Sequence, residues 1–194
     1  MSAPSDRPTM AERYSRALES SHLEVDVEHP GDVDVLIASG WVRPSLGSDL
    51  LRTRSEYDSV NKRELACAGT SLVSRVVVLS SLSSLDATKR HVAGFAIQMA
   101  TITKFDREPE EVLRIAAKAL DVWLDPICHQ CTGRGHSGAY GAPLVLCKPC
   151  GGSGSRRYRL ASSEADHQFG KLLLTRFDEK VEGVANAMRK FLRK

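Results

Sequence analysis

A doubled cysteine pattern constrains the fold of this chain more than any other feature of its sequence. Residues 128–135 read CHQCTGRG and residues 147–154 read CKPCGGSG, so the pattern CxxCxGxG occurs twice. Fifteen residues separate the two cysteine pairs, a spacing typical of four-cysteine zinc sites. The glycines permit backbone angles that other residues resist, and they let N–H groups approach the thiolates. The pattern therefore predicts a small module built around one metal ion.

The predicted ligands of one structural Zn²⁺ are Cys128, Cys131, Cys147 and Cys150. Four thiolates fill a tetrahedral shell, whereas a catalytic zinc keeps one position open. A redox dithiol and an iron–sulfur cluster are the alternatives for the same residues. His129 is expected to point away from the ion and His136 to face solvent. The chain has no metalloprotease, deaminase, phosphate-loop or serine-hydrolase motif, so we expect neither an enzyme nor a small-molecule substrate.

Apolar spacing predicts a mainly α fold, a helical domain with an inserted small zinc-bound β-hairpin or knuckle module. Helices are expected over residues 10–22 and 61–80, from near Asp86 through Met99, and from Pro109 to a stop at Asp125-Pro126. Residues 23–60 are predicted to be irregular, with a strand at Leu23, Val25 and Val27. Residues 163–193 are interpreted either as one helix or as a short helix, a link and a longer basic helix.

Charge is distributed unevenly along the chain. Residues 1–60 carry six Lys and Arg against 11 Asp and Glu, whereas residues 128–194 carry 12 against five. This polarity indicates that the C-terminal third faces a polyanion. The candidate nucleic-acid contacts are Arg156, Arg157, Arg159, Arg176, Lys180, Arg189 and Lys190. A solvated surface is the alternative interpretation for each of them.

Composition and motif together predict four regions. They are an acidic, partly disordered N-terminal region (1–60), a helical domain (61–127), the four-cysteine zinc module (128–159) and a basic helical segment (160–194), which becomes a DNA-binding segment through the resemblance given below. The longest apolar runs, such as Val76–Leu79, are far shorter than the roughly 18–20 residues that span a bilayer. The opening residues MSAPSDRPTMAERY lack the apolar stretch of a signal peptide. We therefore expect a cytoplasmic protein without a membrane partner.

The doubled pattern is the signature of the cysteine-rich domain of J-domain chaperones. That domain has four copies and two zincs, whereas this chain has two copies and lacks the His-Pro-Asp tripeptide of a J-domain. Residues 61–194 more closely resemble the phage late-gene antitermination proteins of the Q type. The matching stretches are DATKRHVAGFAIQMATITKF, EPEEVLRIAAKALDVWLDPICHQCTGRG and CKPCGGSGSRRYR, followed by the basic helical tail.

The resemblance to the Q-type proteins implies a zinc-containing, DNA-binding transcription antitermination factor in the cytoplasm of a bacteriophage host. Its implied partners are double-stranded DNA and, at a late promoter, RNA polymerase with its sigma factor. The family's DNA-contacting helix would fall within residues 163–194. The alternative is a zinc-module chaperone or protein-interaction adaptor that resembles the cysteine-rich domain of the J-proteins.

Overall fold

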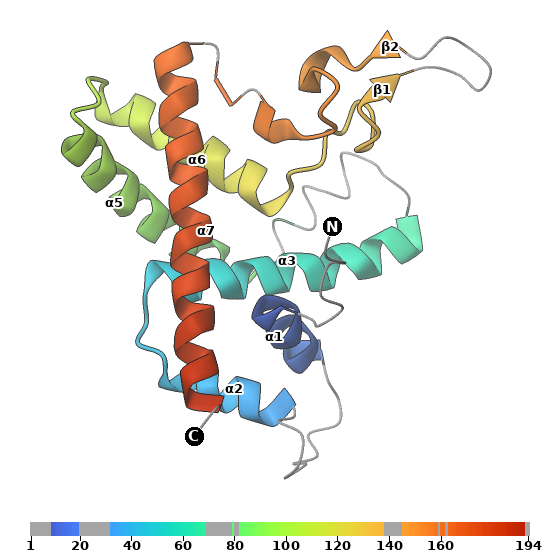
Figure 1. The fold of residues 1–194 in the computed structure, drawn as a ribbon, viewed down its shortest axis with the longest axis vertical. Helices are drawn as coiled ribbons and strands as arrows, with labels where there is room; N and C mark the ends of the chain where they lie inside the picture. The colour runs from blue at the N-terminus through green and yellow to red at the C-terminus, as the bar shows by residue number, and fades with distance from the viewer. Residues whose placement is uncertain are drawn as a thin grey trace, which may run out of the picture. The chain divides into compact units, whose positions relative to one another are not determined.

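The chain is mainly helical, with a small strand-and-turn region at the four cysteines, which confirms the predicted fold class (Figure 1). The structure, a computed structural model, describes residues 9–19, 32–68, 79, 82–137, 145–158, 160–161 and 163–192. The helices are α1 (Met10–Glu19), α2 (Asp32–Trp41), α3 (Leu46–Ala68), α5 (Leu85–Thr103), α6 (Pro109–Leu124) and α7 (Glu164–Leu192). Strands β1 (His136–Ser137) and β2 (Val145–Leu146) and the 3₁₀ turns η1 (Lys148–Cys150) and η2 (Arg156–Tyr158) lie between α6 and α7 in the sequence.

The chain divides into two compact units. The first unit joins Met1–Thr88 with Glu179–Lys194, and the second is Lys89–Asp178. The domain boundaries expected at residues 60, 127 and 159 remain predictions. In the part of the chain that the structure describes, no helix has both the length and the apolar character of a membrane span.

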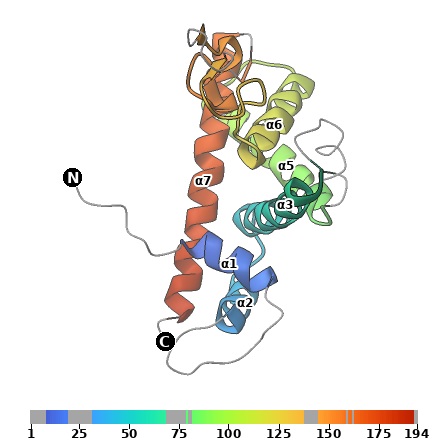
Figure 2. The same ribbon diagram turned by 90° about the vertical axis from the view of Figure 1, so that its right-hand side faces the viewer.

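The core of the first unit forms where α1 and α2 lie side by side and α1 also packs against α3 (Figure 2). The C-terminal part of α7 completes it. The buried members are Met10, Tyr14, Ala17, Val35, Ala38, Leu51, Val184, Ala185 and Met188. A Cβ at Gly47 would lie 2.3 Å from the carbonyl oxygen of Lys180, so only glycine permits this close approach of the two helices.

The prediction of an irregular segment over residues 23–60 is wrong where the structure describes it, because α2 and most of α3 lie there. The buried face of α3 includes Thr53 and Ser55, which conceal its helical apolar spacing. Both hydroxyls are satisfied: Thr53 exchanges a 2.7 Å hydrogen bond with the Thr88 hydroxyl, and Ser55 donates to the carbonyl of Leu51. The strand predicted at residues 23–27 and much of the helix predicted at 61–80 lie outside the described residues.

The second unit is organised around α6, which the sequence predicts with the correct bounds. Pro109 begins the helix with Glu110 and Glu111 in the first turn, where negative charge favours the helix dipole. Its buried face consists of Val112, Ile115, Ala116, Ala119, Leu120, Val122, Trp123 and Leu124. The Trp123 ring meets Phe177 of α7 edge-on, with centroids 6.3 Å apart. This packing fixes the end of α6, which three residues separate from the first cysteine of the metal module.

The C-terminal region is one continuous helix, α7, so the two-helix alternative for residues 163–193 is wrong over the described range. Gly170, which resembles a helix-ending glycine in the sequence, lies inside α7. A Cβ there would meet the Leu160 side chain at 3.0 Å, so the residue permits close packing rather than a helix stop.

Candidate metal centre

The four predicted ligands form one buried cluster. Their sulfur atoms all lie within 4.8 Å of one another, and each side chain is at most 3% exposed. The Sγ atoms of Cys128 and Cys147 are 3.9 Å apart, and those of Cys131 and Cys150 are 3.7 Å apart. A tetrahedron with Zn–S bonds of about 2.3 Å has sulfur atoms about 3.8 Å apart. The donor set and its dimensions are therefore consistent with one structural metal ion, and all four cysteines are free thiols.

The backbone around the cluster repeats with a 19-residue offset. We call residues 127–136 the first knuckle and residues 146–155 the second knuckle. The N–H of Cys128 donates to the carbonyl of Gly154, and the N–H of Cys147 donates to the carbonyl of Gly135, both at 2.9 Å. The antiparallel bridge of Ile127 with Ser155 likewise corresponds to the β1–β2 pair of Leu146 with His136. The two knuckles are thus related by a local pseudo-twofold, and each supplies hydrogen-bond partners to the other.

Glycine is required where the two knuckles meet. Gly135 and Gly154 have φ angles of +77° and +71°, in the left-handed region that side chains disfavour. A Cβ at Gly135 would lie 2.3 Å from the carbonyl oxygen of Gly152, and one at Gly154 would lie 2.3 Å from that of Gly133. The second GxG glycine of each copy therefore permits the close contact between the knuckles.

The same two glycines bring amide groups to the sulfur atoms, as the sequence predicts. The N–H of Gly135 donates to Cys131 Sγ and that of Gly154 to Cys150 Sγ, each at 3.3 Å. Burial acts to raise the pKa of Cys150, but the Gly154 amide and the neighbouring cysteine thiols lower it to about 7. For Cys147 the effect of burial prevails, and it raises the pKa of that thiol to about 12. The thiolate is the form that ligates a metal, so binding of an ion would displace the protons that the thiols carry.

Neither histidine beside the cluster joins it. His129 is exposed, and its Nε2 lies 3.1 Å from a carboxylate oxygen of Asp125 at the end of α6. His136 is exposed on β1, where the sequence analysis expects it to face solvent. In the described part of this module, the four cysteine sulfurs are therefore the only candidate metal ligands that lie together.

The arginines that follow the second knuckle have different surroundings. Arg156 is 20% exposed; its Nη2 pairs with Asp121, and its Nη1 donates to the carbonyl of Asp125 at 3.1 Å. This residue therefore fastens η2 to the end of α6. Arg157 is 40% exposed, and its Nη1 lies 3.4 Å from a carboxylate oxygen of Asp178. Arg159 lies outside the described residues.

The candidate contacts on α7 do not form one group. Arg176 belongs to the second unit and is exposed, whereas Lys180, Arg189 and Lys190 belong to the first. Lys180 and Arg189 are nine residues apart, which at 3.6 residues per turn places them about 180° apart around the helix axis. Arg189 also contacts Glu182 at 2.9 Å and Asn186 at 2.6 Å. Lys180 and Arg189 therefore cannot meet one flat surface together.

The sequence analysis overlooks two exposed cations within the knuckles, Arg134 and Lys148. The signal was present in the sequence: residues 126–163 contain five Lys and Arg and no Asp or Glu. The nearest acids that precede this stretch, Asp121 and Asp125, are engaged by Arg156 and His129. Arg156 and Arg157 are themselves paired with acids outside this stretch, so Arg134 and Lys148 are the exposed cations that the described part of the knuckles contributes to the surface.

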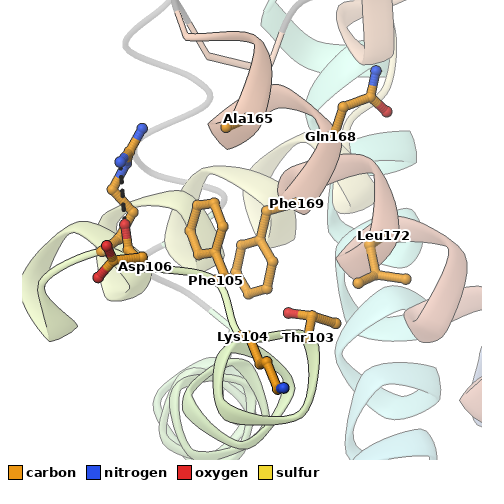
Figure 3. Close-up of a pocket in the computed structure, with 9 residues that line it drawn as sticks. Thr103, Lys104, Phe105, Asp106, Ala165, Gln168, Phe169 and Leu172 are labelled. Carbon is orange, nitrogen blue, oxygen red and sulfur yellow. Dashed lines mark hydrogen bonds between the residues drawn. The ribbon is translucent and has the colours of Figure 1, made fainter.

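Two hollows flank the loop between α5 and α6 in the second unit. The larger, about 410 Å³, contains the rings of Phe105 and Phe169 stacked 4.3 Å apart (Figure 3). Arg107 on the same loop pairs with Asp166 at 2.9 Å. The residues that line this hollow include no histidine or cysteine.

The arrangement of the four cysteines is consistent with a metal centre but points to no protein family. No family model, curated protein or solved structure matches this chain.

Proposed function

We propose that this chain is a zinc-containing, DNA-binding transcription antitermination factor that modifies RNA polymerase at a late promoter. The proposal combines the sequence resemblance with the metal module. The observation that carries it is the position of that module inside an acid-free stretch, residues 126–163, with five basic residues. Counterion release from DNA phosphates favours binding of such a surface to a nucleic acid.

The ion in this proposal is Zn²⁺ and its role is structural. Four buried thiolates leave no open coordination position, which is the pattern of a structural site. The chemistry that the ion supplies is the cross-linking of the two knuckles. The chain's own amides from Gly135 and Gly154 offset part of the thiolate charge.

Within the module, the proposal assigns phosphate contacts to Arg157, Arg134 and Lys148. Arg157 is exposed enough to exchange its 3.4 Å partner Asp178 for a phosphate, whereas Arg156 is held against α6 and positions the turn. Lys190 is an exposed candidate on α7, and Arg176 and Lys180 stay candidates as well.

Salt-dependent retention of duplex DNA tests the binding step. Each of the single variants Arg157→Gln, Arg134→Gln and Lys148→Gln is expected to reduce the slope of log K against log salt by about one. Lys118→Gln, at an exposed position on α6, is the matched control and should leave the slope unchanged. Wild-type protein that shows no salt-dependent retention would exclude DNA binding by this module.

Transcription from a phage late promoter through a terminator tests the activity. Zinc-loaded protein is expected to raise readthrough by purified RNA polymerase holoenzyme, and Cys150→Ser is expected to remove the effect. If readthrough is the same with and without the wild-type protein, antitermination is excluded even where DNA binding is observed.

A further inference from the structure

Each knuckle exposes an aliphatic side chain immediately before its first cysteine. Ile127 is 54% exposed and Leu146 is 66% exposed, and the two correspond under the 19-residue repeat. Single exposed apolar residues are ordinary on protein surfaces. Here, however, exposed aliphatic side chains occupy equivalent positions in both halves of a pseudo-symmetric module, so the feature is repeated.

Both side chains stand on a backbone that the module holds in place. Ile127 forms the bridge with Ser155, and Leu146 pairs with His136 in the β1–β2 sheet. Each also leans over a glycine of its own knuckle. A Cβ at Gly152 would lie 2.9 Å from Leu146 Cδ2, and one at Gly133 would lie 3.5 Å from Ile127 Cγ2. A backbone that is already held in place lowers the cost of ordering these residues on binding, which favours their use as anchors.

The charge around these anchors defines the partner that complements them. Arg134 and Lys148 are exposed in the same two knuckles, and residues 126–163 contain no acid. A complementary partner carries both negative charge and aliphatic groups. Duplex DNA supplies the charge but offers few apolar groups, and base stacking uses aromatic side chains, which neither position has.

We propose that the two knuckles bind a polypeptide segment rich in acidic and aliphatic side chains. Ile127 and Leu146 pack against its aliphatic groups, while Arg134 and Lys148 pair with its carboxylates. This interaction goes beyond the DNA-binding proposal and does not depend on it. The two interactions compete, because Arg134 and Lys148 cannot pair with DNA phosphates and with peptide carboxylates at the same time.

The test uses zinc-loaded full-length protein and fluorescent peptides of equal length. In the first peptide Asp and Leu alternate, in the second Lys replaces Asp, and in the third Ser replaces Leu. Fluorescence anisotropy is expected to show binding of the Asp/Leu peptide that weakens with salt, and weak or no binding of the other two. Ile127→Ser and Leu146→Ser should each weaken binding about tenfold, because each removes an aliphatic contact.

Ile102→Ser is the matched control, since Ile102 is 73% exposed on α5, outside the knuckles, and should leave binding unchanged. Bound zinc is measured in every variant, so that loss of the module is distinguished from loss of the contact. Equal affinity of the wild type and of the Ile127→Ser/Leu146→Ser double variant for the Asp/Leu peptide would overturn the proposal. Absence of Asp/Leu binding, or equal binding of the Lys/Leu peptide, would do the same. If the double variant loses duplex DNA and the peptide to the same extent, the surface belongs to DNA and the proposal is wrong.

Discussion

Alanine at the second GxG glycine of either knuckle should release the metal ion. At Gly135 the new Cβ would lie 2.3 Å from the carbonyl oxygen of Gly152, and the φ angle of +77° would be retained only under strain. The backbone would have to move, which disrupts the amide contact to Cys131 Sγ and the 2.9 Å hydrogen bond from Cys147. The same argument applies to Gly154 by the pseudo-twofold.

The loss of zinc affinity can be estimated by comparing two glycines of the first knuckle, Gly133 and Gly135. Gly133 has a φ angle of +83°, but a Cβ there meets only Ile127 Cγ2 at 3.5 Å. Its alanine variant therefore bears only the left-handed strain, about 1–2 kcal/mol. Gly135→Ala adds disrupted buried hydrogen bonds at about 1–3 kcal/mol each. Because folding of the module and metal binding are coupled, zinc affinity should fall roughly 5- to 30-fold for Gly133→Ala and at least about 100-fold for Gly135→Ala.

Competition for Zn²⁺ against a chromophoric chelator measures these affinities on the full chain. Gly183→Ala is the control, because a Cβ at this exposed position of α7 meets nothing within 4 Å. It should keep the zinc affinity of the wild type and gain about 0.5–1 kcal/mol in stability. Equal zinc affinity of Gly135→Ala and Gly133→Ala would refute the explanation by contact between the knuckles.

Three further predictions concern other contacts. Chelation should release one equivalent of zinc and abolish hydrogen-exchange protection of the Gly135 and Gly154 amides; continued protection would show that the knuckles hold without metal. Burial acts to raise the pKa of Glu56, but hydrogen bonds from the Ser84 N–H and hydroxyl, the Ser83 hydroxyl and Arg52 lower it below its usual value. A carboxyl group with a lowered pKa stabilises the fold above its unfolded pKa, near 4.3, and this stabilisation is lost as the pH falls through the folded pKa. Glu56→Gln should therefore lower the free energy of unfolding by about 1–3 kcal/mol at pH 7 and by less below about pH 4. Urea titrations at both pH values measure the difference. Trp123→Phe removes the 2.7 Å hydrogen bond to Asp178 and should lower the melting temperature without changing zinc content, which metal analysis checks.

Local patterns made the metal centre and α6 predictable from the sequence. The doubled CxxCxGxG specifies both the donors and the glycine positions, because all of these act within a few residues of one another. Helix α6 combines regular apolar spacing with a proline start and an Asp-Pro stop. Several independent signals therefore agree over one short segment.

Contacts between distant residues explain what the sequence did not reveal. Thr53 is a polar residue in a buried position, and its hydrogen bonds to Ser84 and Thr88, 31 and 35 residues away, make that position favourable. Arg156 likewise resembles a free surface cation until Asp121 is placed beside it. Gly170 resembles a helix stop because its packing against Leu160 involves a separate segment.

The reciprocal contacts of the two knuckles have a consequence for minimal fragments of this chain. Every amide–carbonyl pair that joins the knuckles has a counterpart at the 19-residue offset, so a peptide with one knuckle contains both the donor and the acceptor of each pair. Two copies of such a peptide can reproduce the same isologous arrangement, with two sulfurs contributed by each. A self-complementary half-module of this kind would assemble as a homodimer around a single ion.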